Sequence, residues 1–315
     1  MIVTQKASLR IVIVLLRQIS FAQVNLKIEK NQSHFTEGKD SILSYQASEK
    51  SLNGKYIRSN YIHPLYTLDG SILTEDFPVD HLHHRGIFWA WHQLYIGDER
   101  IGDGWEIENF NWEVTAVKEK KQKDASKAIA TTVLWKSPLW KTKNGKEKAF
   151  VKETTTIKVY PKQLHYRIIE IEITLLALEP NVKIGGSEDE KGYGGFSPRI
   201  RLSNDIVFTD PSGKITPTNL PIPASEWMDI SGSLGKNGTK AGLTVLCSPK
   251  NPGAKNPWIL RAKKSMQNAV YPFPGAKAVP LSNKKPTVLR YRLIIHDGEA
   301  NSIPIDKIYQ DYAKN

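Results

Sequence analysis

The feature that most constrains this chain is a period-two alternation of apolar and polar side chains, clearest between residues 163 and 178. Every second residue from Ile169 to Leu175 is apolar, and the residues between them are polar. Side chains of a β-strand point alternately to the two faces of a sheet, so the pattern predicts a strand with one buried face. Residues 151–160 predict a preceding strand, and a tight turn at Pro161 is expected to join the two into a hairpin.

Further strands are predicted along the whole chain, and helical periodicity is nearly absent. The other expected strands are residues 42–45, 87–92, 105–117, 128–135, 206–209, 242–247, 258–262 and 287–296. Only residues 303–313 have the pattern of a helix. The sequence therefore predicts an all-β protein: a large antiparallel two-sheet β-sandwich with a short C-terminal helix. No repeat or shift in composition marks a boundary, so residues 23–315 are expected to form a single β-sandwich domain.

The first 22 residues have the pattern of a secretory signal peptide. Two basic residues precede the apolar run 11–16, and the tripeptide that ends at Ala22 fits the small-x-small rule for cleavage. A signal peptide over residues 1–22 and a periplasmic or secreted mature protein are expected. The alternatives are a disordered N-terminus and an incorrectly assigned start. No other segment approaches the roughly 20 consecutive apolar residues of a membrane helix, so no membrane insertion is expected.

The formal net charge of +12 limits the range of expected partners. Much of the basic charge lies in residues 118–123 and 141–148, which we expect at solvated hairpin tips rather than in one stripe. Nucleic acid is therefore not an expected partner, whereas an anionic carbohydrate is compatible with this charge. The single cysteine, Cys247, excludes an intrachain disulfide, and its apolar surroundings predict a buried thiol rather than a nucleophile.

The densest group of chemically active residues is the run 80–86, with the sequence Asp-His-Leu-His-His-Arg-Gly, which holds three of the eight histidines. Imidazole can give and take a proton near neutral pH and is a common metal ligand, so the run indicates a site. The apolar run 87–92 predicts a buried strand directly after it. If the extended conformation continues back through the cluster, one face carries the following residues: His81, His83 and Arg85. His84 then lies on the opposite face.

The cluster has structural and metal-binding alternatives. His84 can hydrogen-bond a buried carbonyl, and Asp80 with Arg85 can form a structural ion pair. A His-x-His pair on a strand can bind a metal ion, as in cupin-type barrels, but the carboxylate expected three or four residues after His83 is missing. Glu75 or Asp80 would have to complete such a set of ligands. No cofactor is therefore expected, and a bound transition metal is the alternative.

A second group of polar residues lies in the glycine-rich segment 185–196 and directly after it. The glycines allow a close approach of the backbone to a ligand, and Glu188, Lys191, Tyr193 and Arg199 offer acidic, basic and hydrogen-bonding groups. A solvated loop is the alternative. The segment is not a phosphate loop, because the Walker spacing is missing.

Aromatic residues follow the histidines, and apolar faces of sugars stack well on such rings. Trp91 lies an even number of residues from His81, so it shares the parity of the predicted site face. Trp91 is therefore the tryptophan expected in a carbohydrate cleft. Burial in the core is the alternative.

The segments His63-Pro-Leu-Tyr, 80–91 and 191–196 resemble an uncharacterised bacterial family labelled PmoA-like, or methane oxygenase-like. That label implies a subunit of a membrane copper monooxygenase, but the sequence contains no membrane helix. The resemblance implies instead a β-sandwich similar to galactose mutarotase, often encoded among carbohydrate-degradation and sugar oxidoreductase genes in Bacteroidetes and Planctomycetes. It thus implies a role in sugar processing.

The mutarotase-type mechanism uses a histidine acid and a glutamate base on a pyranose. By analogy, the resemblance implies His83 as the acid and Glu188 as the base, with the following residues holding hydroxyl or carboxylate groups: Arg85, Lys191, Tyr193 and Arg199. Together with the residue patterns above, this gives the predicted catalytic residues His81, His83 and Glu188. The predicted substrate-binding residues are His63, Asp80, His84, Arg85, Trp91, Lys191, Tyr193 and Arg199. The sequence therefore predicts an exported enzyme that uses acid–base chemistry on a saccharide, in hydrolysis, β-elimination or epimerisation. The alternatives are a non-catalytic carbohydrate-binding protein and a metal-dependent enzyme with a His-x-His site.

Overall fold

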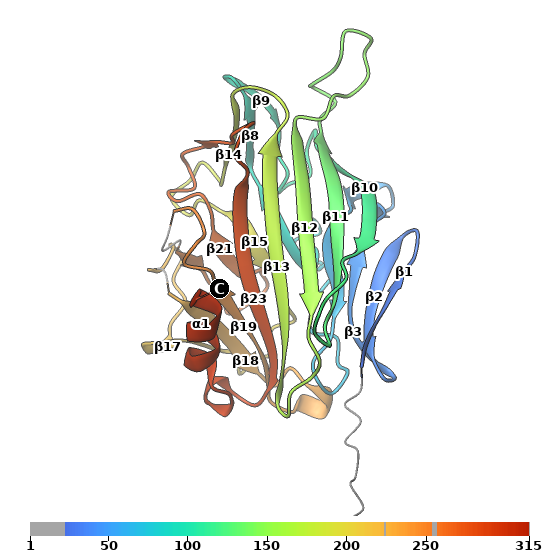
Figure 1. The fold of residues 1–315 in the computed structure, drawn as a ribbon. Helices are drawn as coiled ribbons and strands as arrows, with labels where there is room; N and C mark the ends of the chain where they lie inside the picture. The colour runs from blue at the N-terminus through green and yellow to red at the C-terminus, as the bar shows by residue number, and fades with distance from the viewer. Residues whose placement is uncertain (1–22, 224, 254–256, 315) are drawn as a thin grey trace, which may run out of the picture.

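Two large antiparallel sheets pack face to face in the computed structural model (Figure 1), which describes residues 23–314 except residues 224 and 254–256. The first sheet has eight strands in the order β1 (Val24–Ile28), β2 (Gln32–Glu37), β3 (Asp40–Gln46), β6 (Tyr61–Leu65), β7 (Ile87–Trp91), β15 (Gly194–Pro198), β21 (Asn268–Val270) and β20 (Trp258–Ile259). The second sheet has nine strands in the order β10 (Asn111–Glu119), β11 (Lys127–Lys136), β12 (Val151–Val159), β13 (Tyr166–Ala177), β23 (Thr287–Asp297), β19 (Ala241–Cys247), β18 (Trp227–Gly232), β16 (Val207–Asp210) and β17 (Gly213–Ile215). The predicted all-β class is confirmed. The predicted signal peptide over residues 1–22 lies outside the described residues.

Smaller elements complete the fold. A four-stranded sheet has the order β22 (Val279–Pro280), β14 (Val182–Gly185), β8 (Gln93–Ile96) and β9 (Glu99–Gly102), and a two-stranded sheet joins β4 (Lys50–Leu52) and β5 (Lys55–Arg58). Two short 3₁₀ turns span Lys236–Gly238 and Ala300–Ser302, and the predicted C-terminal helix is α1 (Ile305–Lys314). Within the described part of the chain, no helix is long and apolar enough to cross a membrane.

The long hairpin predicted from the alternation is confirmed as β12 and β13, which pair from Val151 opposite Ala177 to Val159 opposite Ile169. The connection is longer than the predicted two-residue turn, because β12 ends at Val159 and β13 begins only at Tyr166. The prediction for residues 105–117 is wrong in its first half. Residues 103–108 form a hairpin turn instead, in which the backbones of Asp103 and Glu108 exchange two hydrogen bonds.

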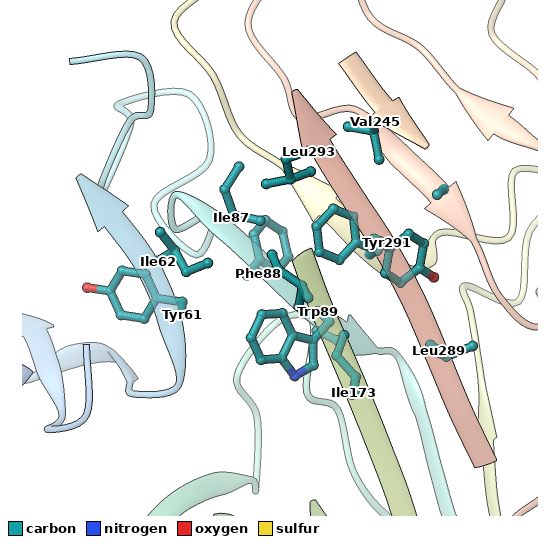
Figure 2. Packing of buried hydrophobic residues seen from close by; sticks show 14 of the residues in the cluster. Tyr61, Ile62, Ile87, Phe88, Trp89, Ile173, Val245, Leu289, Tyr291 and Leu293 are labelled. Atoms are coloured by element: carbon teal, nitrogen blue, oxygen red, sulfur yellow. The ribbon is translucent and has the colours of Figure 1, made fainter. Parts of the chain in front are cut away.

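The core lies between the two large sheets. Strand β13 buries alternate side chains, as its sequence predicts, and they pack against side chains from the eight-stranded sheet (Figure 2). On β7 the side chains of Ile87 and Trp89 are on this inner face. They lie beside Ile173 and Leu293 of the nine-stranded sheet in the same view.

The opposite, outer face of the eight-stranded sheet carries the candidate site. Residues directly opposite in an antiparallel pair share a face, so Phe88 on β7 and its partner Ser197 on β15 both lie on the face opposite to Trp89, where both are still buried. Tyr61, next to the inward-facing Ile62, also points outward, and Figure 2 shows its hydroxyl directed away from the other labelled side chains. The same alternation carried one step beyond β7 places His92 on this outer face. Loops cover the outer face and bury most of these side chains.

Candidate functional site

Three imidazole rings meet in a turn that precedes β7. The backbone N–H of His81 donates to the carbonyl of Pro78, and that of His84 donates to the carbonyl of His81, so this segment is not extended. The predicted strand parity is therefore wrong, and His84 lies with the other two. The ring centroids of His81 and His84 are 4.7 Å apart, those of His83 and His84 are 4.5 Å apart, and those of His81 and His83 are 5.8 Å apart. We call His81, His83 and His84 the histidine cluster.

Each ring of the histidine cluster has a polar partner close to its Nδ1 atom. The partners are Asp80 Oδ2 for His81 at 2.7 Å, Glu106 Oε2 for His83 at 3.3 Å, and Arg199 Nη1 for His84 at 3.4 Å. The three Nε2 atoms have no hydrogen-bond partner among the described residues. The side chains of His81 and His83 are 42% and 13% exposed, whereas His84 is buried. Two imidazoles can thus offer a ring nitrogen to a ligand that arrives from solvent.

Burial keeps the inner rings of the cluster neutral. Desolvation, with a smaller contribution from the charge of Arg58, lowers the pKa of His83 to about 4. Desolvation, with smaller contributions from His83 and His81, holds the pKa of His84 far below its usual range. Arg58 is itself buried, with its guanidinium 4.8 Å from the ring centre of Phe88 and 4.2 Å from that of Trp112. This fixed positive charge opposes a second cation on the neighbouring imidazoles.

Glu106 belongs to the site although the sequence analysis did not select it. The 103–108 hairpin turn brings its carboxylate to His83, and its side chain is 43% exposed. Desolvation raises the pKa of Glu106, and the nearby His92 partly counteracts the shift. The local sequence does not indicate a site at Glu106, because this residue lies in a segment whose alternation predicts an ordinary strand.

Asp103 organises the same hairpin. Its Oδ1 atom accepts hydrogen bonds from the backbone N–H groups of Trp105 and Glu106, both at 2.9 Å. Its Oδ2 atom accepts from His92 Nδ1 at 2.9 Å and from Arg100 Nη2 at 3.2 Å. The hairpin is therefore tied to His92 at the end of β7.

Trp105 is the aromatic residue at the centre of the site. Its ring stacks on His92 with centroids 5.3 Å apart, and it meets the ring of His84 edge-on at 5.9 Å. It also lies 5.8 Å from the ring of Tyr193. Trp105 thus links the histidine cluster, His92 and the glycine-rich segment in one contact network.

Trp91, the tryptophan expected in a cleft, is a core residue. It is only 1% exposed, its indole N–H donates to the carbonyl of Tyr271 at 2.7 Å, and its ring packs against Trp135. The expectation of an exposed Trp91 is wrong because the turn before β7 breaks the parity on which it depended. His92, one residue later, faces the site instead.

Arg85 is also buried away from any ligand. Its Nε atom donates to Asp76, its Nη2 atom to the hydroxyl of Tyr61, and its Nη1 atom to the carbonyl of Tyr56. The guanidinium lies 3.6 Å from the ring centre of Phe77. Arg85 therefore holds the turn in place and cannot bind a substrate directly. Its ion-pair partner is Asp76, not the Asp80 that the structural alternative named.

Arg199 pairs with Asp80 through two hydrogen bonds, at 2.8 and 3.0 Å, and its Nε atom donates to Glu75 Oε2 at 2.7 Å. Arg199 is buried and contacts both Asp80 and His84, so it holds these two side chains in place. Its hydrogen bonds hold the pKa of Asp80 well below the usual range. His63 lies apart from the cluster, with Nδ1 2.9 Å from the hydroxyl of Thr74, and desolvation lowers its pKa.

The glycine-rich segment contributes to the rim of the site. Tyr193, whose hydroxyl accepts a hydrogen bond from Arg261, lies against Trp105. Lys191 is partly exposed and 3.6 Å from Asp189. Glu188 is 59% exposed and accepts from Arg100 at 2.9 Å, so it is linked to Asp103 through Arg100. No contact joins it to the histidine cluster within the described part of the chain.

The described residues contain no group of three or more His, Cys, Asp or Glu side chains placed to hold a metal ion. In the histidine cluster, the rings of His81 and His84 are nearly parallel, with an angle of 9° between their planes. Ring nitrogens bind a metal in the plane of the ring, so two stacked rings do not converge on one ion. Between residues 23 and 314, outside the gaps, the geometry of the cluster is that of imidazole rings packed against one another.

Comparison with models of protein families identifies the family of this chain. The sequence model of a family of unknown function, DUF6807, matches residues 32–310. The chain belongs to the DUF6807 family. Comparison of this DUF6807 protein with curated proteins finds no match. The match does not carry the PmoA-like label, so the likeness to that family stays a resemblance.

Solved structures similar to this DUF6807 protein include two α-galactosidases. The enzyme from Lactobacillus brevis gives a TM-score of 0.39 and 8% sequence identity, over 89% of this chain and 40% of that chain. The GH36 enzyme AgaA from Geobacillus stearothermophilus gives a TM-score of 0.36 and 9% identity, over 89% of this chain and 41% of that chain. The chain thus spans about two fifths of the length of these structures. These scores are low, so the likeness carries no argument about activity.

Proposed function

We propose that the histidine cluster and Glu106 form the active site of an exported enzyme that transfers protons to and from a saccharide. The observation that carries the proposal is the contact of 3.3 Å between His83 Nδ1 and Glu106 Oε2. Burial lowers the pKa of His83 to about 4 and raises the pKa of Glu106. Ionisable groups whose environments shift their pKa values in this way are typical of acid–base sites.

These pKa shifts give His83 and Glu106 roles that differ from those implied by the analogy with the mutarotase-type mechanism. His83 is neutral near pH 7, so it is a poor general acid, and its ring nitrogens serve better to orient a hydroxyl group. Glu106 retains its proton to a higher pH than an ordinary glutamate, which suits a proton donor. We therefore assign proton donation to Glu106 and substrate orientation to His81 and His83. Glu188, in its salt bridge with Arg100, is assigned to the rim.

A saccharide fits the chemistry of this surface. Imidazoles and carboxylates can bind several hydroxyl groups at once, and the partly exposed ring of Tyr193 lies beside them, packed against the buried ring of Trp105. The net charge of +12 is compatible with an anionic sugar. Hydrolysis, β-elimination and epimerisation all need paired proton donation and acceptance, so the proposal covers these reaction types and requires no cofactor.

A saccharide screen tests the proposal. The full-length protein is incubated with neutral, acidic and 3-keto saccharides, and products are followed by proton NMR. We expect turnover of at least one sugar, and a loss of kcat of about 100-fold or more in Glu106→Gln. Glu113→Gln is the matched control, because Glu113 is an exposed glutamate paired with Lys136 on the far hairpin β10–β11.

The other outcomes decide between the alternatives. Saturable sugar binding without any product would favour a carbohydrate-binding protein. Turnover that is unchanged in Glu106→Gln would show that the acid is elsewhere. Stoichiometric transition metal in the purified protein, lost in a His81→Ala/His83→Ala double variant, would favour a metal-dependent enzyme.

A further inference from the structure

His92 has the geometry of a proton acceptor. Its side chain is 14% exposed, its Nδ1 atom is 2.9 Å from Asp103 Oδ2, and its Nε2 atom has no hydrogen-bond partner among the described residues. A carboxylate oxygen can only accept, so Nδ1 carries the proton in this contact. The neutral ring then has its lone pair on Nε2. A carboxylate that fixes this tautomer is the arrangement by which hydrolases prepare a histidine base.

Asp103 cannot change its orientation without breaking the hairpin. Its Oδ1 atom is the acceptor for two successive backbone N–H groups, those of Trp105 and Glu106. Rotation of the carboxylate would remove both hydrogen bonds, and the N–H of Trp105, which is buried, would then cost about 1–3 kcal/mol as an unsatisfied donor. Oδ2 is thereby held toward His92 and Arg100.

His92 and the histidine cluster belong to the same site. The ring of Trp105 stacks on His92 and meets the edge of His84, so one side chain contacts both. His92 is also close enough to interact electrostatically with His83 and Glu106, since it contributes to the lowered pKa of His83 and opposes the rise in the pKa of Glu106. A substrate that reaches Glu106 therefore lies within the field of His92.

We propose that His92 is the general base of this site, that Asp103 is the residue that positions it, and that Glu106 is its proton-donating counterpart. The inference rests on the proposed function and adds to it the group that accepts a proton from the sugar. His92 Nε2 bonds to a proton from a hydroxyl or an acidic C–H of the sugar and becomes an imidazolium. The electron pair left on the sugar moves to a carbonyl or leaving oxygen, which takes the proton of the Glu106 carboxyl and leaves a carboxylate.

The Asp103→Asn variant tests the role of Asp103 without a substrate. The two backbone N–H groups need an acceptor, so the asparagine oxygen takes the place of Oδ1 and the amide NH₂ takes the place of Oδ2. That NH₂ donates to His92 Nδ1 and forces the proton onto Nε2. We expect ¹⁵N NMR of the imidazoles to show an unprotonated Nε2 of His92 in the unmodified protein near pH 8, and the opposite tautomer in the variant.

Asp98→Asn is the matched control, because Asp98 is an exposed aspartate in the turn between β8 and β9, and its side chain pairs with Lys183. It should leave the tautomer of His92 unchanged. A protonated Nε2 in neutral His92 of the unmodified protein would overturn the inference, whatever the sugar screen shows.

Kinetics on a sugar found in the screen separate the two proposals. We expect His92→Gln and Asp103→Asn to lower kcat by about 100-fold or more with little change in KM, as the loss of a general base or its tautomer requires. Turnover that survives His92→Gln at full rate would overturn the role of His92 and leave the proposed function standing. A lack of turnover of every sugar by the unmodified protein would overturn the proposed function itself, and with it the role of His92 as a base.

Discussion

At the scale of single residues, His83 and His84 show how burial in this site changes protonation. In the unfolded chain both imidazoles have the ordinary pKa of about 6.5. In the folded protein, desolvation lowers the pKa of His83 to about 4 and that of His84 further. The unfolded state therefore binds more protons than the folded state between these values.

This difference predicts a loss of stability in mild acid. The free energy of unfolding should be at its full value above about pH 6.5 and should fall as pH decreases toward 4, by up to about 1.4 kcal/mol per pH unit for each histidine. Urea unfolding at pH 7, 6 and 5 measures the slope. The His83→Gln variant should flatten it, whereas His34→Gln, on the partly exposed strand β2, should not. Equal slopes in the unmodified protein and His83→Gln would contradict the proposed cause.

At the scale of elements, the sequence predicts segments whose environment is regular. Strand β13 alternates because it pairs along its whole length with β12 and β23, so the period of two is preserved from end to end. The pattern fails before β7, which pairs with β6 only through Ile62 and Ile87. Without a further partner strand, the histidine segment leaves the sheet and turns, and the parity of its side chains is lost.

The same reasoning explains why half of the candidate site was not predicted. The cluster of three histidines is local in sequence, so its density was visible. Glu106, Asp103 and His92 come together only because the 103–108 hairpin turn folds onto the outer face of the eight-stranded sheet. Nothing in the local sequence pattern encodes that tertiary contact.

The loop that carries Tyr193 depends on a close backbone contact, which leads to a prediction for Gly192. This residue has a φ of +65°, and a Cβ atom there would lie 2.9 Å from both N and Cα of Gly275. Gly192→Ala should therefore cost the strain of a left-handed alanine, about 1 kcal/mol, and a further 1–3 kcal/mol, approximately, for the overlap. Thermal unfolding measures the loss.

Gly54→Ala provides the comparison. Gly54 has a φ of +77° in the turn between β4 and β5, but no atom lies within 4 Å of its added Cβ. Only the backbone strain should remain, so the decrease in Tm should be clearly smaller than for Gly192→Ala. Equal decreases would mean that the two loops move apart easily and that the contact does not fix the rim of the site.

At the scale of the whole molecule, Glu153 joins the two large sheets. It is fully buried on β12, and its Oε1 atom accepts hydrogen bonds from Asn60 Nδ2 and Trp89 Nε1, both at 2.8 Å. The hydroxyl of Thr155 also donates to Oε1, and Trp135 Nε1 donates to Oε2 at 2.8 Å. Trp89 belongs to the eight-stranded sheet and Trp135 to the nine-stranded sheet, so one carboxylate links the two layers at the centre of the core.

The hydrogen-bond pattern requires this carboxyl group to accept on both oxygens, and desolvation raises its pKa. An amide N–H and two indole N–H groups can only donate, so each of them needs an acceptor on Glu153. Glutamine places an NH₂ group, which cannot accept, against one of these donors. Glu153→Gln should therefore lower the free energy of unfolding by about 1–3 kcal/mol, the cost of an unmatched buried donor.

Urea unfolding followed by tryptophan fluorescence measures this loss, with Glu172→Gln as the control. Glu172 lies on the neighbouring strand β13, is partly exposed and pairs with Arg290, so its replacement should cost at most about 1 kcal/mol. If Glu153→Gln is as stable as this control, the donors around Glu153 do not depend on both of its oxygens as acceptors. A clear loss in Glu153→Gln alone would show that the two acceptor oxygens of Glu153, which take hydrogen bonds from both sheets, hold together the framework beneath the histidine cluster.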